Sequence, residues 1–302
     1  MSGPAAGGLL ELACTVALAA GQLLVSRDVR ATVVATKSSP TDVVTEADQA
    51  AEVLIRKRIG AVRPADRILG EEGGEAPAGP GPAGGGEGEG EGGAGEGWGG
   101  GATSVRWIVD PLDGTVNYLY GLPDWAVSVA AEEAGTVVAG AVFVPRRGEL
   151  FSAALGQGAW LRPAGPAGPG GNDVPAIRLT CNRDVPLSHA LVATGFGYEE
   201  GQRLIQAEVL RGVLPRVRDI RRGGSCAVDL CSLASGHVDA FYERGVNLWD
   251  IAAGGLIAGE AGALVTGLQG RPASPSMTLA APPPLHGELH DLLASLNPER
   301  DG

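Results

Sequence analysis

The sequence has few cysteines, few aromatic residues and no excess of basic residues. Of its 302 residues four are cysteines, and Phe, Trp and Tyr together make up 4%. The cysteines show no C-x-x-C spacing, which argues against a zinc site and favours a reduced, cytoplasmic protein. The net charge of −12 argues against nonspecific nucleic-acid binding, because that needs a basic face. We therefore expect no nucleic-acid partner.

Long apolar runs are also scarce. The most apolar stretch, residues 9–25, lacks a basic segment before it and is interrupted by Glu11 and Gln22. This pattern predicts an amphipathic first helix over residues 8–29 rather than a signal peptide. No run approaches the ~20 apolar residues of a membrane span, so no membrane contact is expected.

The order of the expected elements indicates a mixed α+β fold. Apolar runs at 125–131 and 136–145 are joined by Ala134-Gly135, which predicts an antiparallel hairpin. From residue 187 onward, short strands alternate with helical segments, including a strand expected at 217–220. We expect one domain over residues 1–302, with an N-terminal α+β half at about 8–180 and a C-terminal α/β half at about 187–296.

Two segments lack the apolar residues needed for a core. Residues 73–104 are almost entirely Gly, Ala, Glu and Pro, and residues 163–175 are rich in Pro and Gly. Such composition predicts flexible surface loops. Because acids end the expected strands on both sides of 73–104, a loop that returns the chain to the same sheet would bring those acids together.

The central stretch of the sequence is the run from Trp107 to Tyr118. It begins as an apolar strand and ends at Asp110 and Asp113, followed by Thr115. Carboxylates at the end of a buried strand are costly to desolvate unless they are paired or bind a cation. No Lys or Arg lies within the run, so a metal is the natural partner, and oxygen ligands favour a hard ion such as Mg²⁺.

Further acids recur at strand ends or helix starts. Asp48 stands three residues after the expected N-cap Thr45, Glu71 and Glu72 end a strand, and Asp250 opens a very apolar helix. Each has a simple explanation as a helix cap or a solvated turn. Their convergence without basic partners would be repulsive, and two or three divalent cations would remove that repulsion.

Such a cluster beside helix starts suits a phosphate group. Backbone N–H groups at Gly114-Thr115 and at Gly224-Ser225-Cys226 are candidates to hold phosphate oxygens. The chemistry that uses this arrangement is phosphoryl transfer to water, since one metal activates water and another stabilises the leaving alkoxide. The sequence has no Walker loop, no kinase signature and no supported Ser-His or Cys-His pair.

Four motifs together resemble the inositol monophosphatase family. The two longer ones are Asp110-Pro-Leu-Asp-Gly-Thr-Val-Asn-Tyr118 and the segment from Leu248 to Gly262, and the shorter ones are Asp42-Val-Val-Thr-Glu-Ala-Asp48 and Gly70-Glu-Glu72. The resemblance spans about residues 9–265. It implies a layered αβαβα sandwich of the inositol monophosphatase and fructose-1,6-bisphosphatase type, a homodimer, and lithium-sensitive hydrolysis with two to three Mg²⁺ ions per site.

The resemblance also implies roles for individual residues. The metal ligands it implies are Glu71, Asp110, the carbonyl of Leu112, Asp113 and Asp250. The catalytic residues it implies are Glu71 and Thr115, which orient the attacking water, and Asp48, which supports that water or a further metal. The substrate-binding residues it implies are Asp113, Gly114, Thr115, Cys226, Glu243 and Asp250. Lys37 matches a basic residue near the metals.

Two departures from the family pattern stand out. Cys226 occupies a position where alanine is common, which alters the phosphate side of the pocket. The 73–104 loop is longer and richer in glycine than usual, directly after Glu71. Arg218, Arg221 and Arg222 are open to two interpretations, as residues that steer an anionic substrate or as solvated or dimer-facing side chains.

The substrate is less well specified than the family. The leading hypothesis is hydrolysis of a small phosphorylated polyol, inositol 1-phosphate above all. The alternatives are histidinol phosphate, since Glu243 suits an amine as well as a hydroxyl, and phosphoadenosine phosphate or fructose bisphosphate. A non-catalytic role as a regulatory partner on the same scaffold is the remaining alternative.

Overall fold

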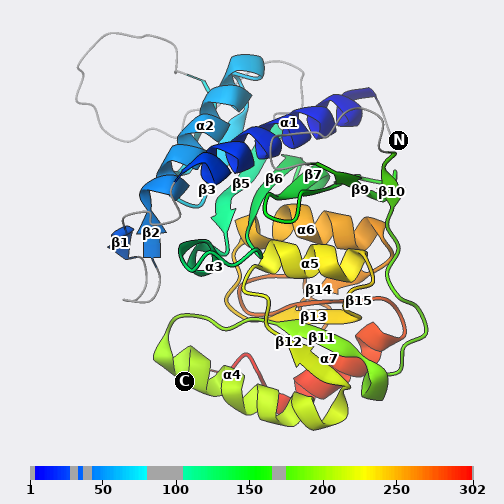
Figure 1. Cartoon of the computed structure of the whole chain (residues 1–302). Helices are drawn as coiled ribbons and strands as arrows, with labels where there is room; N and C mark the ends of the chain where they lie inside the picture. Colours follow the sequence, from blue (N-terminus) through cyan, green and yellow to red (C-terminus); the bar gives the residue numbers. More distant parts are fainter. Residues whose placement is uncertain (1–3, 28–32, 37–42, 80–104, 165–174, 301–302) are drawn as a thin grey trace, which may run out of the picture.

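The computed structural model describes residues 4–27, 33–36, 43–79, 105–164 and 175–300. Its helices and strands are stacked in five alternating layers (Figure 1). A helix pair covers an eight-stranded sheet, a second helix pair separates that sheet from a five-stranded one, and a third pair covers the far side. This is the αβαβα arrangement expected of an α+β layered sandwich, so the predicted fold class is confirmed.

The eight-stranded sheet carries the central acidic stretch. Its strands in spatial order are β10 (Ile177–Arg178), β9 (Ala159–Pro163), β8 (Glu149–Ala154), β7 (Thr136–Val144), β6 (Ala126–Glu133), β5 (Val105–Asp113), β3 (Arg67–Gly70) and β4 (Gly74–Pro77). Neighbours are antiparallel except β3 and β5, which run parallel with Gly70 opposite Val109. The carboxyl ends of β3 and β5 therefore lie side by side, as predicted from the acids that follow them.

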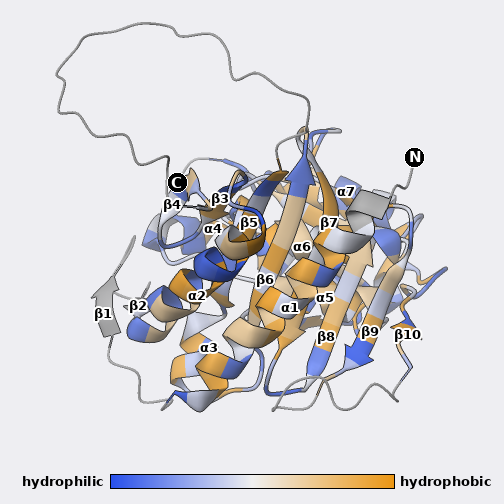
Figure 2. Cartoon of the chain, turned by 90° about the horizontal axis from the view of Figure 1, so that it is seen from above, coloured by the Kyte–Doolittle hydropathy of each residue, from blue (hydrophilic) through white to orange (hydrophobic). Residues whose placement is uncertain are grey.

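Helices α1 (Pro4–Ser26) and α2 (Glu46–Val62) cover the outer face of this sheet. Figure 2 shows α1 crossing the sheet from above, and it contacts β6, β7 and β8. Its inward side chains Leu9, Val16 and Leu24 are buried in one cluster with strand residues. This burial stabilises the layer at roughly 25 cal/mol per Å² of apolar surface.

In the described part of the chain, α1 over Gly7–Ser26 is long and apolar enough to cross a membrane by length and composition. The prediction that no run approaches that length was therefore wrong. The interruptions by Glu11 and Gln22 do not lower the mean hydropathy enough, because small apolar residues fill the rest of the helix. In this fold its apolar side packs on the sheet.

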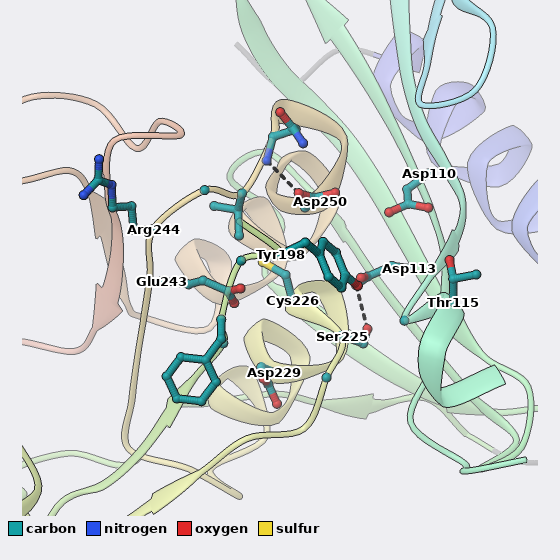
Figure 3. A pocket seen from close by; sticks show the side chains of 18 of the residues that line it. Asp110, Asp113, Thr115, Tyr198, Ser225, Cys226, Asp229, Glu243, Arg244 and Asp250 are labelled. Atoms are coloured by element: carbon teal, nitrogen blue, oxygen red, sulfur yellow. Dashed lines mark hydrogen bonds between the residues drawn. The ribbon is translucent and has the colours of Figure 1, made fainter. Parts of the chain in front are cut away.

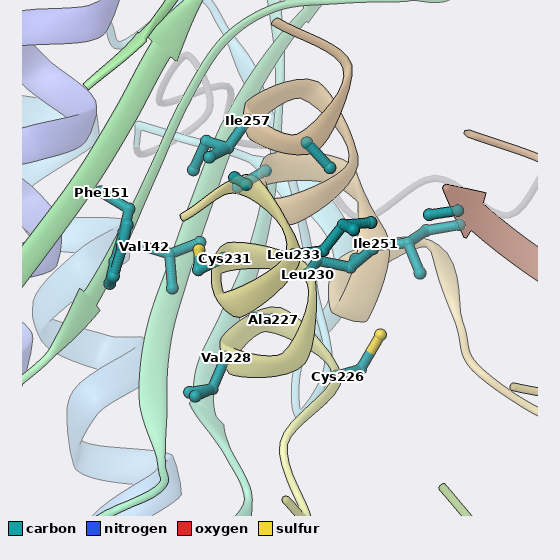
Figure 4. Packing of buried hydrophobic residues seen from close by; sticks show 14 of the residues in the cluster. Val142, Phe151, Cys226, Ala227, Val228, Leu230, Cys231, Leu233, Ile251 and Ile257 are labelled. Carbon is teal, nitrogen blue, oxygen red and sulfur yellow. The ribbon is translucent and has the colours of Figure 1, made fainter. Parts of the chain in front are cut away.

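The inner layer consists of α5 (Cys226–Ala234) and α6 (Leu248–Glu260). Figure 4 shows their apolar side chains packed against each other and against the sheet, with Leu230 and Ile257 among them. Gly254 permits the close approach, since a Cβ there would lie 3.0 Å from the side chain of Leu230. This packing fixes the starts of both helices next to the end of β5.

The second sheet lies on the other side of this layer. Its order is β12 (Asp219–Arg221), β11 (Leu191–Thr194), β13 (Ala240–Glu243), β15 (Thr278–Ala281) and β14 (Leu264–Thr266). Helices α4 (Glu200–Val213) and α7 (Leu285–Leu296) cover its outer face in Figure 1. The remaining elements are β1 (Val33–Thr36), β2 (Val43–Thr45), α3 (Thr115–Leu119) and two short 3-10 helices, Leu187–His189 and Leu214–Arg216.

Several predicted boundaries need correction. The strand expected at 217–220 is β12, which begins two residues later, because a 3-10 helix with Pro215 ends only at Arg216 and Val217 is its C-cap. The loop expected from residue 73 contains β4, which pairs with β3 through backbone hydrogen bonds that need no apolar side chains. Residues 80–104 and 165–174 of the two predicted loops, and Lys37, lie outside the described residues.

Candidate active site

The end of β5 turns sharply at the two central acids. The pairing of β5 with β6 is interrupted between Asp110 and Asp113, so the strand bulges there. Asp110 is 2% exposed and accepts a hydrogen bond of 2.9 Å from the N–H of Leu112. Gly114 then adopts φ +90°, where a side chain would be strained and its Cβ would lie 3.0 Å from the carbonyl oxygen of Asp124. This turn directs both carboxylates to one side.

Thr115 joins this turn to the start of α2. Its hydroxyl group lies 3.2 Å from Oδ1 of Asp48 and 3.1 Å from the carbonyl oxygen of Leu112, and it can donate its one proton to either. Asp48 is fully buried and also completes the predicted capping box, accepting from the N–H of Thr45 at 2.8 Å. Asp48 is therefore both a helix cap and a partner of Thr115.

Glu71 follows β3 and is fixed by groups that the sequence did not indicate. Its N–H donates to the carbonyl of Val109 on the parallel strand β5 at 3.3 Å. The next two N–H groups, of Glu72 and Gly73, donate to the carboxylate of Glu52 at 2.8 and 2.9 Å. Glu52 lies one helical turn after Asp48 on α2, so the two side chains share one face of the helix. That spacing was the signal in the sequence that could have placed Glu52 near the site.

Asp113 connects β5 to the start of α5. Its Oδ2 accepts hydrogen bonds from the hydroxyl of Ser225 at 2.6 Å and from the N–H of Ala227 at 2.7 Å. Ser225 is the N-cap of α5 and also accepts from the N–H of Val228 at 3.2 Å. The anion at this helix start is thus Asp113 itself, while the predicted phosphate contact at Gly224–Cys226 stays a prediction.

Asp250 reaches the same region from the start of α6. Its Oδ2 accepts from the N–H of Asn247 at 2.6 Å and forms the second capping box of the site. Burial, and after it the charges of Asp113 and Glu71, raise the pKa of Asp250 well above its usual range. Burial and the charges of Glu71, Asp113 and Asp250 do the same to the pKa of Asp110. Acids from three elements therefore repel one another here.

This set of oxygen donors fits a hard divalent cation. Among the described residues no Lys or Arg forms an ion pair with Asp110 or Asp250. The charges that shift the pKa values of these two residues belong to other acids. A bound cation would remove both the repulsion and part of the desolvation cost. Within the same residues, no group of three or more His, Cys, Asp or Glu side chains is arranged closely enough to hold a metal ion. The donor chemistry fits Mg²⁺, whereas the number of ions remains a prediction.

These acids open onto a cavity of about 470 Å³. Figure 3 shows Asp110, Asp113, Thr115 and Asp250 together at one side of it. All the predicted site residues except Asp48 line the cavity, namely Glu71, Asp110, Leu112, Asp113, Gly114, Thr115, Cys226, Glu243 and Asp250. Asp48 lies behind Thr115, whose hydroxyl group is 3.2 Å from its Oδ1.

The other side of the cavity holds Cys226 and Glu243. Burial, and then the charge of Glu243, raise the pKa of the Cys226 thiol well above its usual range, so the thiol stays protonated. Burial, and then the charge of Asp229, raise the pKa of Glu243 to about 8. Asp229 and Arg222 also line this side. No role was predicted for Asp229, although it lies one turn after Cys226 on the same helix face.

The cavity and its acids occur on a scaffold shared with known proteins. The sequence model described as the inositol monophosphatase family matches residues 8–300. The inositol-1-monophosphatase SuhB of Mycobacterium tuberculosis is 44% identical over 260 residues, which cover 86% of this chain and 80% of that protein. A protein of Vibrio cholerae named Nus factor SuhB is 36% identical over 236 residues, 78% of this chain and 75% of that protein.

Solved structures give the same result. The structure of Mycobacterium tuberculosis SuhB has a TM-score of 0.74 at 37% identity and covers 97% of this chain and 98% of its own. The family match spans far more than half of the sequence, and the acids of the cavity stand at the motifs that resemble the family. The chain therefore belongs to the inositol monophosphatase family and is a phosphoric monoester hydrolase.

Proposed function

We propose that this enzyme hydrolyses inositol 1-phosphate to inositol and phosphate in a Mg²⁺-dependent reaction. The observation that carries the proposal is the convergence of Asp110, Asp113, Asp250 and Glu71 on one cavity whose far side is polar. The relatives named inositol-1-monophosphatase support the choice of substrate. Two to three ions per site are proposed, as is inhibition by lithium.

The residues that would hold Mg²⁺ are Glu71, Asp110, Asp113, Asp250 and the carbonyl of Leu112. When bound, the metal supplies a water of lowered pKa and positive charge for the leaving alkoxide. Binding of the ions requires ionised carboxylates, so the raised pKa values of Asp110 and Asp250 imply that metal binding releases protons.

Thr115 is suited to orient the attacking water. If its hydroxyl donates to Asp48 or to the carbonyl of Leu112, its oxygen lone pairs are left to accept a hydrogen bond from that water. Asp48, held by the capping box, fixes the direction of the hydroxyl. Glu71, held after β3, is the second acceptor. Together they would hold the water in line with the phosphorus atom.

The opposite side of the cavity would bind the alcohol. Glu243 is placed at the end of β13 to accept hydroxyl protons, and Cys226 contributes a neutral surface next to it. Cys226, at a position where alanine is common in the family, lies between Asp113 and Glu243 rather than on the phosphate side alone, and its sulfur atom narrows the cavity there (Figure 3). We expect this to favour small polyols over bulky nucleotide substrates.

The test is a panel of phosphate-release assays. The substrates are inositol 1-phosphate, histidinol phosphate, fructose 1,6-bisphosphate and phosphoadenosine phosphate, each with Mg²⁺, with EDTA, and with added Li⁺. We expect the highest kcat/KM for inositol 1-phosphate and no turnover with EDTA. A higher kcat/KM for another substrate would replace inositol 1-phosphate in the proposal, and no metal-dependent release from any of them would refute it.

A regulatory role is the second candidate, because a relative that is 36% identical is named a Nus factor. Complementation separates the two roles: the gene for this protein is deleted from its host, and the Asp110→Asn variant is supplied in its place. Rescue by a variant without phosphatase activity would show that the non-catalytic role is the main one.

We also propose a homodimer in the cytoplasm. The four cysteines are unpaired, in keeping with a reducing compartment. Light scattering on the purified protein tests the dimer, and a monomer mass at micromolar concentration would refute it.

A further inference from the structure

Asp229 is a buried acid on the wall of the active-site cavity, and no described residue hydrogen-bonds its carboxyl group. It lies on α5, one helical turn after Cys226, and is 6% exposed. Its carboxyl group makes neither a hydrogen bond nor an ion pair with any residue that the structure describes. Buried polar groups in folded proteins almost always have partners. An unpartnered one that lines a cavity indicates a ligand that supplies the missing partner.

Two other buried acids in the described part of the chain are hydrogen-bonded. Asp239, similarly buried, accepts hydrogen bonds of 2.7 Å from the side chain of Asn182 and of 2.7 Å from the N–H of Leu191. Asp66 accepts one of 2.9 Å from the indole of Trp107. The fold therefore provides donors for these two acids, whereas Asp229 has none among the described residues. The side of Asp229 that lines the cavity is therefore open to a ligand.

Asp229 shares its part of the cavity with two charged residues. Glu243 reaches it from the end of β13, and Arg222 from the loop before α5. Figure 3 shows Asp229 and Glu243 on the far side of the cavity from Asp110 and Thr115. If the phosphate lies at the acids beside β5, the part of the cavity lined by Asp229 and Glu243 is open to the alcohol of the substrate.

We propose that Asp229 hydrogen-bonds a hydroxyl group of the polyol that carries the phosphate and, together with Glu243, determines substrate specificity. The inference rests on the proposed function of this site. It adds a second acid to the alcohol-binding side of the cavity.

Acids dominate the charges around Asp229 and Glu243, but the charge of Arg222 disfavours an ammonium group there. Arg222 lies close enough to lower the pKa of both Asp229 and Glu243, and its positive charge would repel an ammonium group. Burial, and then the charge of Asp113, raise the pKa of Asp229 to about 7, so near neutral pH the carboxyl group exchanges between its charged and protonated forms. A group that can both accept and donate matches a hydroxyl, which does the same.

The test compares Asp229→Ala and Asp229→Asn with the wild-type enzyme on three substrates. Inositol 1-phosphate has several hydroxyls, p-nitrophenyl phosphate has none, and phosphoethanolamine has an ammonium group. We expect Asp229→Ala to raise KM for inositol 1-phosphate about tenfold, the value of one good hydrogen bond, with little change in kcat. KM for p-nitrophenyl phosphate should change less than twofold. Asp229→Asn, which keeps a hydrogen-bonding side chain, should restore most of the affinity.

The melting temperature provides a readout that does not need activity. Because none of the described residues bonds to the Asp229 carboxyl group, Asp229→Ala should leave the melting temperature unchanged or raise it. Asp239→Ala is the matched control, because it removes a carboxylate that is hydrogen-bonded. It should lower the melting temperature without changing the ratio of the KM values for inositol 1-phosphate and p-nitrophenyl phosphate. A large drop for Asp229→Ala would show a structural role and overturn the inference.

The remaining outcomes are distinguishable. Equal changes in KM for inositol 1-phosphate and p-nitrophenyl phosphate would refute the role of Asp229 while leaving the proposed function intact. A wild-type preference for phosphoethanolamine that Asp229→Ala abolishes would show that the site binds amines, which also overturns the inference. No phosphate release by the wild-type enzyme from any of the three would refute the proposed function itself.

Discussion

Removal of the Glu52 carboxylate should loosen the turn that positions Glu71 relative to the other acids of the site. Glu52 is 3% exposed and accepts hydrogen bonds from the N–H groups of Glu72 and Gly73 and from Nε of Arg56 at 2.8 Å. Arg56 in turn donates to the carbonyl of Gly74 at 2.7 Å. The two side chains thus hold both ends of the turn that follows β3.

The magnitude follows from these contacts. Each hydrogen bond between a backbone N–H and a carboxylate contributes about 1.5–3 kcal/mol, and the partly exposed pair with Arg56 adds about 0–1 kcal/mol. Water can reach Gly73, which is exposed, and replaces part of the loss. We therefore expect Glu52→Ala to lower the free energy of unfolding by about 2–4 kcal/mol. Loosening of groups that orient a metal ligand typically weakens metal affinity about 10–100-fold.

The assay is phosphate release as a function of Mg²⁺ concentration, together with thermal unfolding. Glu52→Ala should shift the Mg²⁺ midpoint upward by about 10–100-fold, whereas Glu52→Gln, which retains one acceptor oxygen, should shift it less. Glu46→Gln, an exposed glutamate of the same helix, is the control and should change neither quantity. If Glu52→Ala lowered the melting temperature but left the Mg²⁺ midpoint unchanged, the reasoning that links Glu52 to Glu71 would be refuted.

Three further predictions concern the acids and the turn between them. Asp110→Asn should abolish phosphate release while the melting temperature stays level or rises, because one of several repelling buried charges is removed; near wild-type activity would contradict the ligand assignment. Gly114→Ala should cost about 1–3 kcal/mol of stability, measured by chemical denaturation, since φ is +90° there; an unchanged midpoint would show that the turn relaxes. In metal-free protein the pKa values of Glu243 and Asp229, about 8 and about 7, lie above those of the unfolded chain, so the folded state binds more protons and stability should fall as pH rises from about 5 to 8. The double variant Glu243→Gln with Asp229→Asn should flatten this fall, and stability that rose over the same range would reverse the sign of the argument.

The ends of the strands were the most predictable part of the site. The apolar run before Asp110 and the acids after it predicted where β5 ends, and the acids on both sides of the 73–104 loop predicted that β3 and β5 are neighbours. The capping box at Thr45 and Asp48 followed from local spacing and is confirmed. These features depend on a few consecutive residues, which a single sequence displays directly.

Contacts between distant segments could not be read in the same way. Thr115 and Asp48 are 67 residues apart, and Ser225 and Asp113 are 112 apart. Nothing local to either residue indicates its partner, because the approach is set by the packing of α2 and α5 on the sheet. Only the family resemblance suggested that Thr115 and Asp48 act together.

Some elements were missed although a signal was present. Leu285, Leu289 and Leu293 recur every four residues and are buried along one side of α7. This is the ordinary spacing of an amphipathic helix. The strands β14 and β15 are only three and four residues long, so their alternation was too short to read. Their pairing supplies the backbone partners that the short runs lack by themselves.

The explanation of Asp48 and Asp250 as helix caps and their explanation as site residues are not alternatives. Each carboxylate uses one oxygen, Oδ2, to accept from the N–H of its N-cap residue, which fixes the side chain relative to the helix. In Asp48 the other oxygen meets Thr115, and Asp250 lines the cavity next to Asp113. A cap bond limits the rotamers of an acid whose other oxygen faces a cation or a water, so less conformational entropy is lost when the ligand binds. The same two hydrogen bonds therefore start α2 and α6 and hold the orientation of Asp48 and Asp250.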